Sequence, residues 1–211
     1  MSSFLAIDTY DGNDIASISA YLEQNIYPYL VGKGFKMLPY FGSLATPDYV
    51  GPAAAAAGVS LLTGAGHGTY TTFEGYQGQD VFAVGAYAPE HVSGKIVHFV
   101  SCENAKQLGP DFVKNGCLAY VGYDENFTFS PAFSDVFYDC DSEILRALAD
   151  GATVAEAVAR AKDLYSRTIS GLIAAGDAAS MDAAHQLQYN LQHLRSPLDG
   201  AMWGSAEAKL S

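Results

Sequence analysis

The sequence predicts an α/β protein in which helices cover both faces of a mostly parallel sheet. Short apolar runs alternate with amphipathic stretches over residues 4–122, and this alternation is typical of parallel strands joined by helices. Apolar residues make up 49% of the chain and charged residues only 16%, which supports a packed core and excludes a disordered or coiled-coil protein. A length of 211 residues suits one domain or at most two small ones. We therefore expect a single domain over residues 1–211.

The strands of this sheet are expected where short apolar runs occur. They lie at residues 4–7, 35–41, 59–63, 95–100 and 118–122. After the first run, apolar residues recur at helical spacing from Ile15 to Ile26, and Asp14 precedes them as a candidate helix cap. Residues 69–88 are rich in Thr, Tyr, Phe and Gly, which indicates a small hairpin.

The C-terminal part of the chain is predicted to be helical over about residues 131–195. Gly151, Gly171 and Gly176 are expected to break this region into separate helices. A helix is also expected at residues 108–115, and a loop with a helix at residues 47–57. The last segment is predicted to hold a short closing strand around Met202 and Trp203.

The chain is strongly acidic. It has 23 Asp and Glu against 11 Lys and Arg, a formal net charge of −12, and no run of basic residues. This balance argues against nucleic acid or an anionic membrane surface as a partner and favours cationic ligands or peptides. The N-terminus lacks a basic leader, and the longest apolar stretch, residues 52–59, is too short to span a bilayer. We therefore expect a cytoplasmic protein with neither a signal peptide nor a transmembrane segment.

The cysteines do not predict a disulfide framework or a metal site. Cys102, Cys117 and Cys140 are few and irregularly spaced, and no C-x-x-C pair is present. The glycine-rich segment at residues 64–68 lacks the spacing of a dinucleotide fingerprint. We expect no cofactor and no metal; the acidic composition is compatible with calcium, but no motif indicates it.

A histidine and a cysteine follow two of the predicted strands at the point where each strand ends. His67 lies between glycines after the run at residues 59–63, and Cys102 follows the run at residues 95–100. Because active sites of parallel sheets form at the carboxyl ends of the strands, neighbouring strands would bring both side chains into one crevice. A thiol and an imidazole are the minimum for acyl transfer through a sulfur nucleophile. The backbone N–H groups of Gly68 and Cys102 are candidates for an oxyanion hole.

The other cysteines and histidines fit catalysis less well. Cys117 precedes a strand and is expected to be a small buried hydrophobe. Cys140 lies between Asp139 and Asp141, which disfavour its thiolate. His98 lies within a strand and is expected to pack in the core. The remaining histidines occupy a turn and the helical region: His91, His185 and His193.

Three segments together resemble the caspase-like cysteine peptidases of clan CD, which include gingipains, clostripain, legumain, metacaspases and caspases. The segments are LLTGAGHGTY, KIVHFVSCEN and NGCLAYVGYDENF, in that order. The resemblance implies a three-layer α/β/α sandwich of the caspase-hemoglobinase type with a mostly parallel central sheet. It also implies a catalytic dyad of His67 and Cys102, with Gly68 in the oxyanion hole.

The resemblance further implies how the substrate is selected. In this family, the loops after the first and fifth strands form the pocket for the residue before the cleaved bond, and here they carry Asp8, Asp11, Asp124 and Glu125. Metacaspases and clostripain-type enzymes use acids there to bind Arg or Lys, whereas caspases use arginines; this chain has no arginine before Arg146. We therefore expect a cysteine endopeptidase that cleaves peptides or proteins after basic residues, with Asp8 and Asp124 binding the basic side chain.

Two other functions remain open at the level of sequence. The first is a catalytically inactive member of the same fold that serves as a scaffold or binding module. The second is a thiol hydrolase or amidase that acts on a small molecule. Oligomeric state and activation are not indicated by any pattern in the sequence.

Overall fold

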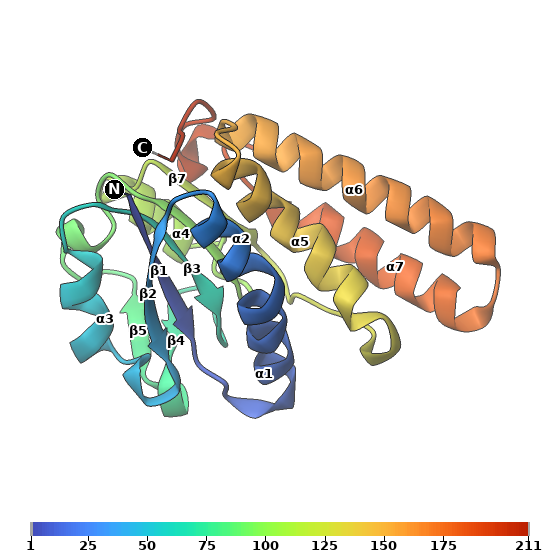
Figure 1. Cartoon of the computed structure of the whole chain (residues 1–211), viewed down its shortest axis with the longest axis horizontal. Coiled ribbons are helices and arrows are strands. Elements are labelled where there is room, and N and C mark those ends of the chain that lie inside the picture. Colours follow the sequence, from blue (N-terminus) through green and yellow to red (C-terminus); the bar gives the residue numbers. More distant parts are fainter. Residues whose placement is uncertain (1, 211) are drawn as a thin grey trace.

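The central sheet has six strands in the order β2-β1-β3-β6-β7-β8. Figure 1 labels β1, β2, β3 and β7 of this sheet. The computed structural model describes residues 2–210. All neighbouring strands in this sheet are parallel except the pair of β7 and β8. The strands are β1 Ser3–Asp8, β2 Lys36–Phe41, β3 Val59–Ala65, β6 Ile96–Val100, β7 Ala119–Tyr123 and β8 Leu194–Arg195. The predicted fold class, an α/β sandwich with a mostly parallel sheet, is confirmed.

Helices and a hairpin cover the two faces of the sheet. The helices are α1 Gly12–Tyr21, α2 Tyr27–Gly32, α3 Pro47–Ala54, α4 Leu108–Lys114, α5 Ser134–Ala149, α6 Val154–Ala175 and α7 Ala178–His193. A π-helical turn, Leu22–Ile26, joins α1 to α2. The antiparallel pair β4 Thr72–Glu74 and β5 Asp80–Ala83 forms the hairpin expected between residues 69 and 88.

Two separate apolar cores result from the alternation of side chains along the strands. Phe4 and Ala6 of β1 belong to one core, which α1, α2, α5, α6 and α7 cover. Leu5 and Ile7 of the same strand belong to the other core, which α3, α4 and the β4–β5 hairpin cover. All four side chains are fully buried. Because β1 is buried on both faces, it appears in the sequence as a continuous apolar run rather than as an alternating one.

Two expectations for the C-terminal part are wrong. Gly171 does not break the helical region, since α6 continues past it and ends before Gly176, which adopts the left-handed conformation of a helix cap. A single exposed glycine costs a helix only about 1 kcal/mol, and the Thr153–Glu156 capping box stabilises the start of α6. The closing strand is β8, next to β7, whereas Ala201–Trp203 forms a 3-10 turn.

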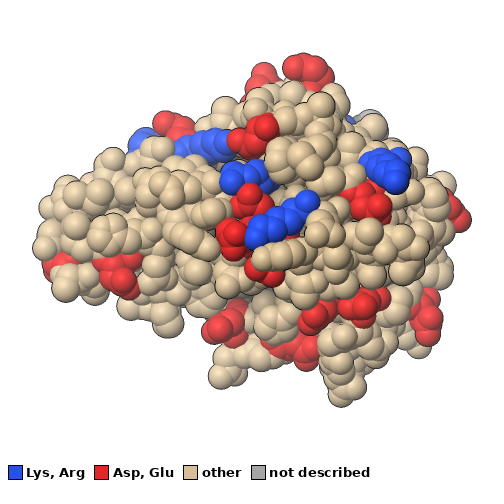
Figure 2. Space-filling model, turned by 180° about the vertical axis from the view of Figure 1, so that it is seen from behind, with Lys and Arg blue, Asp and Glu red and all other residues tan. Residues whose placement is uncertain are grey.

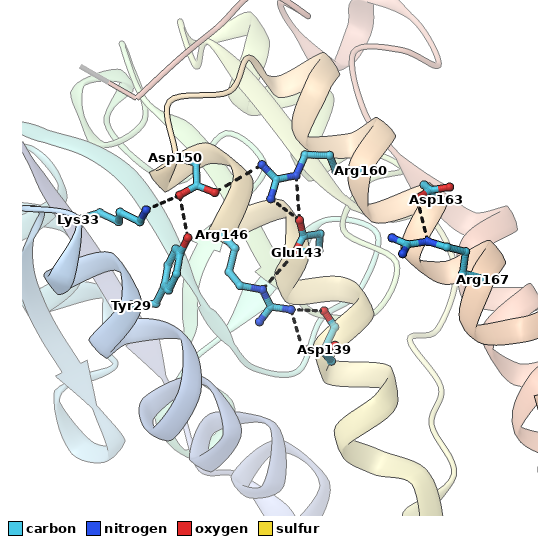
Figure 3. A network of polar contacts seen from close by, with 9 residues as sticks. All are labelled: Tyr29, Lys33, Asp139, Glu143, Arg146, Asp150, Arg160, Asp163 and Arg167. Atoms are coloured by element: carbon cyan, nitrogen blue, oxygen red, sulfur yellow. Dashed lines mark hydrogen bonds and ion pairs between the residues drawn. The ribbon is translucent and has the colours of Figure 1, made fainter. Parts of the chain in front are cut away.

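A network of ion pairs on the surface joins α2 to α5 and α6 (Figure 3). Asp150, at the end of α5, accepts from Lys33 at 2.8 Å and from the Tyr29 hydroxyl at 2.7 Å. Glu143 pairs with Arg160 of α6 at 2.7 Å and with Arg146 at 3.1 Å. Such pairs are partly exposed and contribute little singly, but as a network they fix how the helices lie on this face of the sheet.

The helices α6 and α7 pack against each other and extend beyond the edge of the sheet (Figure 1). Over the described residues, no helix combines the length and the apolar character that crossing a membrane requires. The C-terminal end of α7 leads directly into β8, which pairs with the end of β7. This pairing brings the last turn of α7 close to the carboxyl edge of the sheet.

Candidate active site

His67 and Cys102 lie at equivalent positions, just beyond the carboxyl ends of the neighbouring strands β3 and β6. Ala65 of β3 lies opposite Val100 of β6 in the parallel register, and each of the two candidate residues follows two positions later in the chain. Both line one cavity of about 110 Å³. The tertiary structure therefore brings the imidazole and the thiol to the same cavity at the carboxyl edge of the sheet.

The wall of this cavity comes from two elements that are distant in sequence. Helix α1 contributes Asp14, Ile15 and Ile18, and the loop after β7 contributes Phe127 and Phe129. Four of these five side chains are apolar, and Asp14 is the acid among the residues that line the cavity. The cavity therefore combines an apolar wall with one carboxylate.

The imidazole of His67 is exposed and is oriented by a backbone carbonyl. Its Nε2 atom lies 3.1 Å from the carbonyl oxygen of Asp11. A carbonyl oxygen only accepts, so Nε2 carries the hydrogen and Nδ1 keeps its lone pair when the ring is neutral. Asp11 is itself held, because its carboxylate accepts from the Gly78 N–H at 3.2 Å. The neighbouring Tyr10 has a φ of 54°, a left-handed conformation that is uncommon outside glycine.

Cys102 is half-buried at the start of a tight turn. Burial raises the pKa of its thiol, a hydrogen bond from the backbone of Phe127 lowers it, and the charge of Glu103 raises it; the net shift is upward. Glu103 has a φ of 62°, and its N–H donates to the carbonyl oxygen of Glu125 at 3.1 Å. A left-handed residue directly after the thiol is a local strain of the kind that is concentrated at functional sites.

Gly68 lies so close to the turn after β6 that no side chain fits there. A Cβ atom at this position would clash with the Ser101 hydroxyl and lie 2.6 Å from the carbonyl oxygen of Cys102. The hydrogen bonds on either side, from Glu74 N–H to His67 and from Thr69 N–H to Thr72, leave the Gly68 N–H unused in the hairpin. Within residues 2–210, neither the Gly68 N–H nor the Cys102 N–H donates to another backbone group outside the regular elements.

Asp8 lies at the end of β1, as the sequence suggests, but it is fully buried. Its carboxylate accepts from the Tyr27 hydroxyl at 2.6 Å and from the Ala65 N–H at 3.0 Å. Burial is the main reason that its pKa is raised to about 7, against the lowering effect of these hydrogen bonds. Asp8 is not one of the described residues that line the cavity; it fixes the end of β3 two residues before His67.

Asp124 lies just after β7 and is paired with the C-terminal segment. It accepts from Arg195 Nε at 2.6 Å and from His193 Nδ1 at 2.9 Å, and its own N–H donates to the carbonyl oxygen of His193. The neighbouring Glu125 pairs with Lys106 at 2.7 Å. In the described part of the chain, neither acid lines the cavity that holds Cys102.

Asp14 is the site residue that the sequence reasoning missed. It was expected to cap the helix, but α1 begins at Gly12 with Asp11 in the cap position. Asp14 is therefore in the first turn, one residue before Ile15 and one turn before Ile18, and it lines the cavity with both. An indication was present in the sequence, since a helix that follows a parallel strand begins at the carboxyl edge of the sheet.

The other cysteines are buried and poor nucleophiles, as predicted. Burial raises the pKa of Cys117 to about 12 and that of Cys140 to about 11. His98 is fully buried in β6, as predicted, where it contacts Asp141 at 3.1 Å. Among residues 2–210, no group of three or more His, Cys, Asp or Glu side chains is arranged to hold a metal ion.

Comparisons with known proteins add one structural likeness. No protein-family model matches the sequence, and no curated protein matches it significantly. The chain is similar to a solved complex of the pro- and mature domains of RgpB from Porphyromonas gingivalis, with a TM-score of 0.46 and 16% sequence identity. The match covers 88% of this chain and 45% of that one, so the chain spans less than half the length of the RgpB chain. A likeness at this level assigns no residue and no activity to the chain.

Proposed function

We propose that this protein is a cysteine endopeptidase in which Cys102 is the nucleophile and His67 the general base. The observation that carries the proposal is the register of β3 and β6, because it puts both residues at one cavity on adjacent parallel strands. Cys117 and Cys140, by contrast, are buried with strongly raised pKa values. A thiol and an imidazole at one cavity are the pair of groups that thiol-based acyl transfer requires.

The geometry supports a defined role for each group. The Asp11 carbonyl holds Nε2–H of His67, so Nδ1 accepts the proton of the Cys102 thiol as the sulfur attacks the carbonyl carbon of the peptide bond. The N–H groups of Gly68 and Cys102 stabilise the oxyanion that forms. His67 then returns the proton to the leaving amine, and the thioester left on Cys102 is hydrolysed by a water molecule that His67 deprotonates.

The raised pKa of Cys102 makes the general base necessary. Since burial keeps the thiol protonated in the free protein, sulfur attack and proton transfer to His67 are coupled rather than preceded by a stable thiolate. The apolar side chain of Phe127 lines the same cavity. It excludes water from the place where the sulfur attacks the substrate.

We also infer that the cavity binds a basic side chain before the cleaved bond, and that Asp14 supplies the charge. The aliphatic stem of Lys or Arg would pack on Ile15, Ile18 and the two phenylalanines, while its cationic end pairs with the Asp14 carboxylate. Asp8 and Asp124 would contribute indirectly, by fixing the ends of β3 and of β7.

The distribution of charge agrees with a cationic substrate. On the face shown in Figure 2, Lys and Arg lie in the upper and middle parts, and the charged side chains of the lower part are Asp and Glu. The carboxyl ends of β1 and β3 point towards the same edge (Figure 1). An acidic rim raises the local concentration of basic peptides and speeds their association, and salt should weaken this effect.

The direct test is the hydrolysis of fluorogenic peptides with Arg, Lys, Asp or Leu before the reporter, by the wild type and by Cys102→Ala. We expect hydrolysis after Arg and Lys by the wild type and none by the variant, with circular dichroism unchanged. Cys140→Ala is the matched control, since it removes another thiol without touching the cavity. Hydrolysis that survives in Cys102→Ala would reject the assignment.

Two further measurements separate the alternative functions. A peptidyl electrophile that ends in Arg should label Cys102 of an active peptidase, and the absence of both labelling and hydrolysis would favour a binding module. Hydrolysis of small amides with none of peptides would favour a small-molecule amidase. His67→Ala should lose most of the rate, with a residual rate that the oxyanion donors sustain.

A further inference from the structure

The loop between β7 and α5 forms one wall of the cavity through two aromatic side chains that flank a threonine. Phe127 and Phe129 line the cavity, and Thr128 lies between them. Phe127 packs on Tyr123 with the ring centroids 5.0 Å apart, and Phe129 packs on Tyr138 at 5.2 Å. Both aromatic rings share this cavity with Cys102. The conformation at Thr128 therefore decides the position of the cavity wall beside the thiol.

Asn190 of α7 holds this loop by three hydrogen bonds to Thr128. The Thr128 N–H and hydroxyl both donate to Asn190 Oδ1, at 3.0 and 3.1 Å. Asn190 Nδ2 in turn donates to the Thr128 carbonyl oxygen at 2.7 Å. The amide of Asn190 thus satisfies the N–H, the C=O and the hydroxyl of a single loop residue.

The burial of Asn190 shows that this contact is specific. The side chain is fully buried, and a buried amide is costly unless its polar atoms are paired. Both polar ends of the Asn190 side chain are used by Thr128, which lies 62 positions away in the chain. An apolar residue of similar size would pack at this place in α7 without holding the loop, so the amide is explained by the loop rather than by the helix.

A second contact between the same segments lies at the start of the loop. His193 and Arg195, just beyond Asn190, hold the carboxylate of Asp124. The loop is therefore fixed at its start by the end of α7 with β8, and in its middle by Asn190. Between these two points, the carbonyl oxygen of Glu125 accepts a hydrogen bond from the Glu103 N–H, in the turn that carries Cys102.

We propose that Asn190 is a positioning residue that fixes the cavity wall of Phe127 and Phe129 over Cys102 through its bonds to Thr128. The proposal deepens the peptidase function proposed above and rests on it for its kinetic consequences. In this role Asn190 does not touch substrate. It keeps the wall of the cavity in place, and so limits how easily solvent and reagents reach the sulfur of Cys102.

The test compares Asn190→Ala with Leu187→Ala. Leu187 is fully buried on the same helix, so its variant weakens the packing of α7 but keeps the bonds to Thr128. In Asn190→Ala we expect hydrogen exchange over residues 124–130 to be about tenfold faster or more. Alkylation of Cys102 by iodoacetamide should rise by a similar factor, because exposure removes the burial that raises the pKa of the thiol. KM for basic peptides should rise more than kcat falls.

Each outcome decides the proposal. Faster exchange and alkylation in Asn190→Ala but not in Leu187→Ala supports it; unchanged values in a folded Asn190→Ala, or equal increases in both variants, overturn it. If Asn190→Ala does not fold, Thr128→Val, which lacks only the hydroxyl bond, should show a smaller increase in alkylation, and no increase there overturns the proposal. If the wild type hydrolyses no peptide, the proposed peptidase function fails, whereas exchange and alkylation still decide the role of Asn190.

Discussion

Ala65 lies opposite Val100 across the parallel pair of β3 and β6. This register determines the geometry of the candidate site, because His67 and Cys102 each follow two residues after the paired positions. Parallel strands end at the same edge of a sheet, so a parallel pair in register presents equivalent positions side by side. A shift of the register by one residue would turn the side chains of one strand to the opposite face.

The assignment of Asp14 predicts a loss of selectivity without a loss of fold. Asp14→Asn keeps the size of the side chain and removes the charge that faces the cavity. Asp14 is exposed in the free protein, so water screens its attraction for a cationic side chain. We expect kcat/KM for Arg and Lys peptides to fall by about fivefold, the value of an exposed ion pair, with little change for a Leu peptide. Steady-state kinetics on matched peptides measure the ratio.

Asp48→Asn is the control for net charge, since Asp48 is an exposed acid in the first turn of α3, on the other face of the sheet. It should leave the ratio of basic to neutral substrates unchanged. Equal effects of the two substitutions would mean that overall charge, and not a pocket, selects the substrate. Selectivity that persists in Asp14→Asn would assign the pocket to another acid.

Two Gly→Ala substitutions test different properties: Gly68→Ala should lower kcat, whereas Gly171→Ala should raise the free energy of unfolding. Gly68→Ala introduces a Cβ that clashes with Ser101 and the carbonyl of Cys102. The clash displaces the N–H that we propose as an oxyanion donor, so kcat should fall by about a hundredfold or more. Gly171→Ala meets no atom within 4 Å and lies in α6. It should raise the free energy of unfolding by up to about 1 kcal/mol and leave kcat unchanged. Full activity in Gly68→Ala would exclude its N–H from the mechanism.

Asp8 predicts a stability that falls as pH rises. Its pKa is about 7 in the folded protein, against an ordinary value of 3.8 for an exposed aspartic acid, so the folded state binds more protons between these values. The free energy of unfolding from this group therefore decreases from pH 3.8 to about 7 and is constant above that, a total on the order of 4 kcal/mol.

Asp8→Asn removes this titration and keeps an acceptor for the Ala65 N–H. Urea unfolding of the wild type and the variant across this range should show the pH dependence reduced in the variant. The variant should also be the more stable of the two above neutral pH. Parallel curves for the two proteins would show that the Asp8 carboxyl ionises as readily in the folded chain as in the unfolded one.

The pair of His98 and Asp141 predicts a large loss of stability when one partner is removed. Burial alone lowers the pKa of His98, but the Asp141 charge and the hydrogen bonds to Asp141 and Val121 outweigh it and raise the pKa. Asp141→Asn leaves a buried imidazole without its counter-charge and should cost about 3–5 kcal/mol. Thermal or urea unfolding measures the change.

Asp139→Asn is the matched control on the same helix, because the Asp139 side chain is partly exposed and pairs with Arg146 at the surface. It should cost about 1 kcal/mol or less. The stabilisation from His98 is fully present below its ordinary pKa of 6.5 and is lost as pH rises through the higher folded value. A cost for Asp141→Asn as small as that of the control would mean that the buried pair is close to neutral for stability.

The pattern of the sequence was sufficient for the five parallel strands of the sheet and for choosing His67 and Cys102 as candidates, but not for β8, the last strand of the sheet. The apolar runs at residues 59–63 and 95–100 correspond to β3 and β6, because strands buried on both faces must be continuously apolar. His67 and Cys102 stood out because polar residues directly after such runs lie at the carboxyl edge. The helix boundaries were less certain, as Gly171 shows: the packing of α6 against α5 and α7 outweighs the intrinsic preference of one exposed glycine.

The sequence by itself determined the order of the five parallel strands along the chain and placed His67 and Cys102 just after two of them, since both follow from local hydrophobic patterns. The pairing of β3 with β6, which puts the two residues at the same level, is a tertiary contact. Only the tertiary structure decided which acid faces the cavity. Asp8, Asp14 and Asp124 all lie near the ends of elements. Asp8, however, is buried and hydrogen-bonded to Tyr27 and Ala65, and Asp124 is paired with Arg195 and His193. Those partners come from distant parts of the chain, and the burial and pairing of a carboxylate depend on such long-range contacts, which no local pattern encodes.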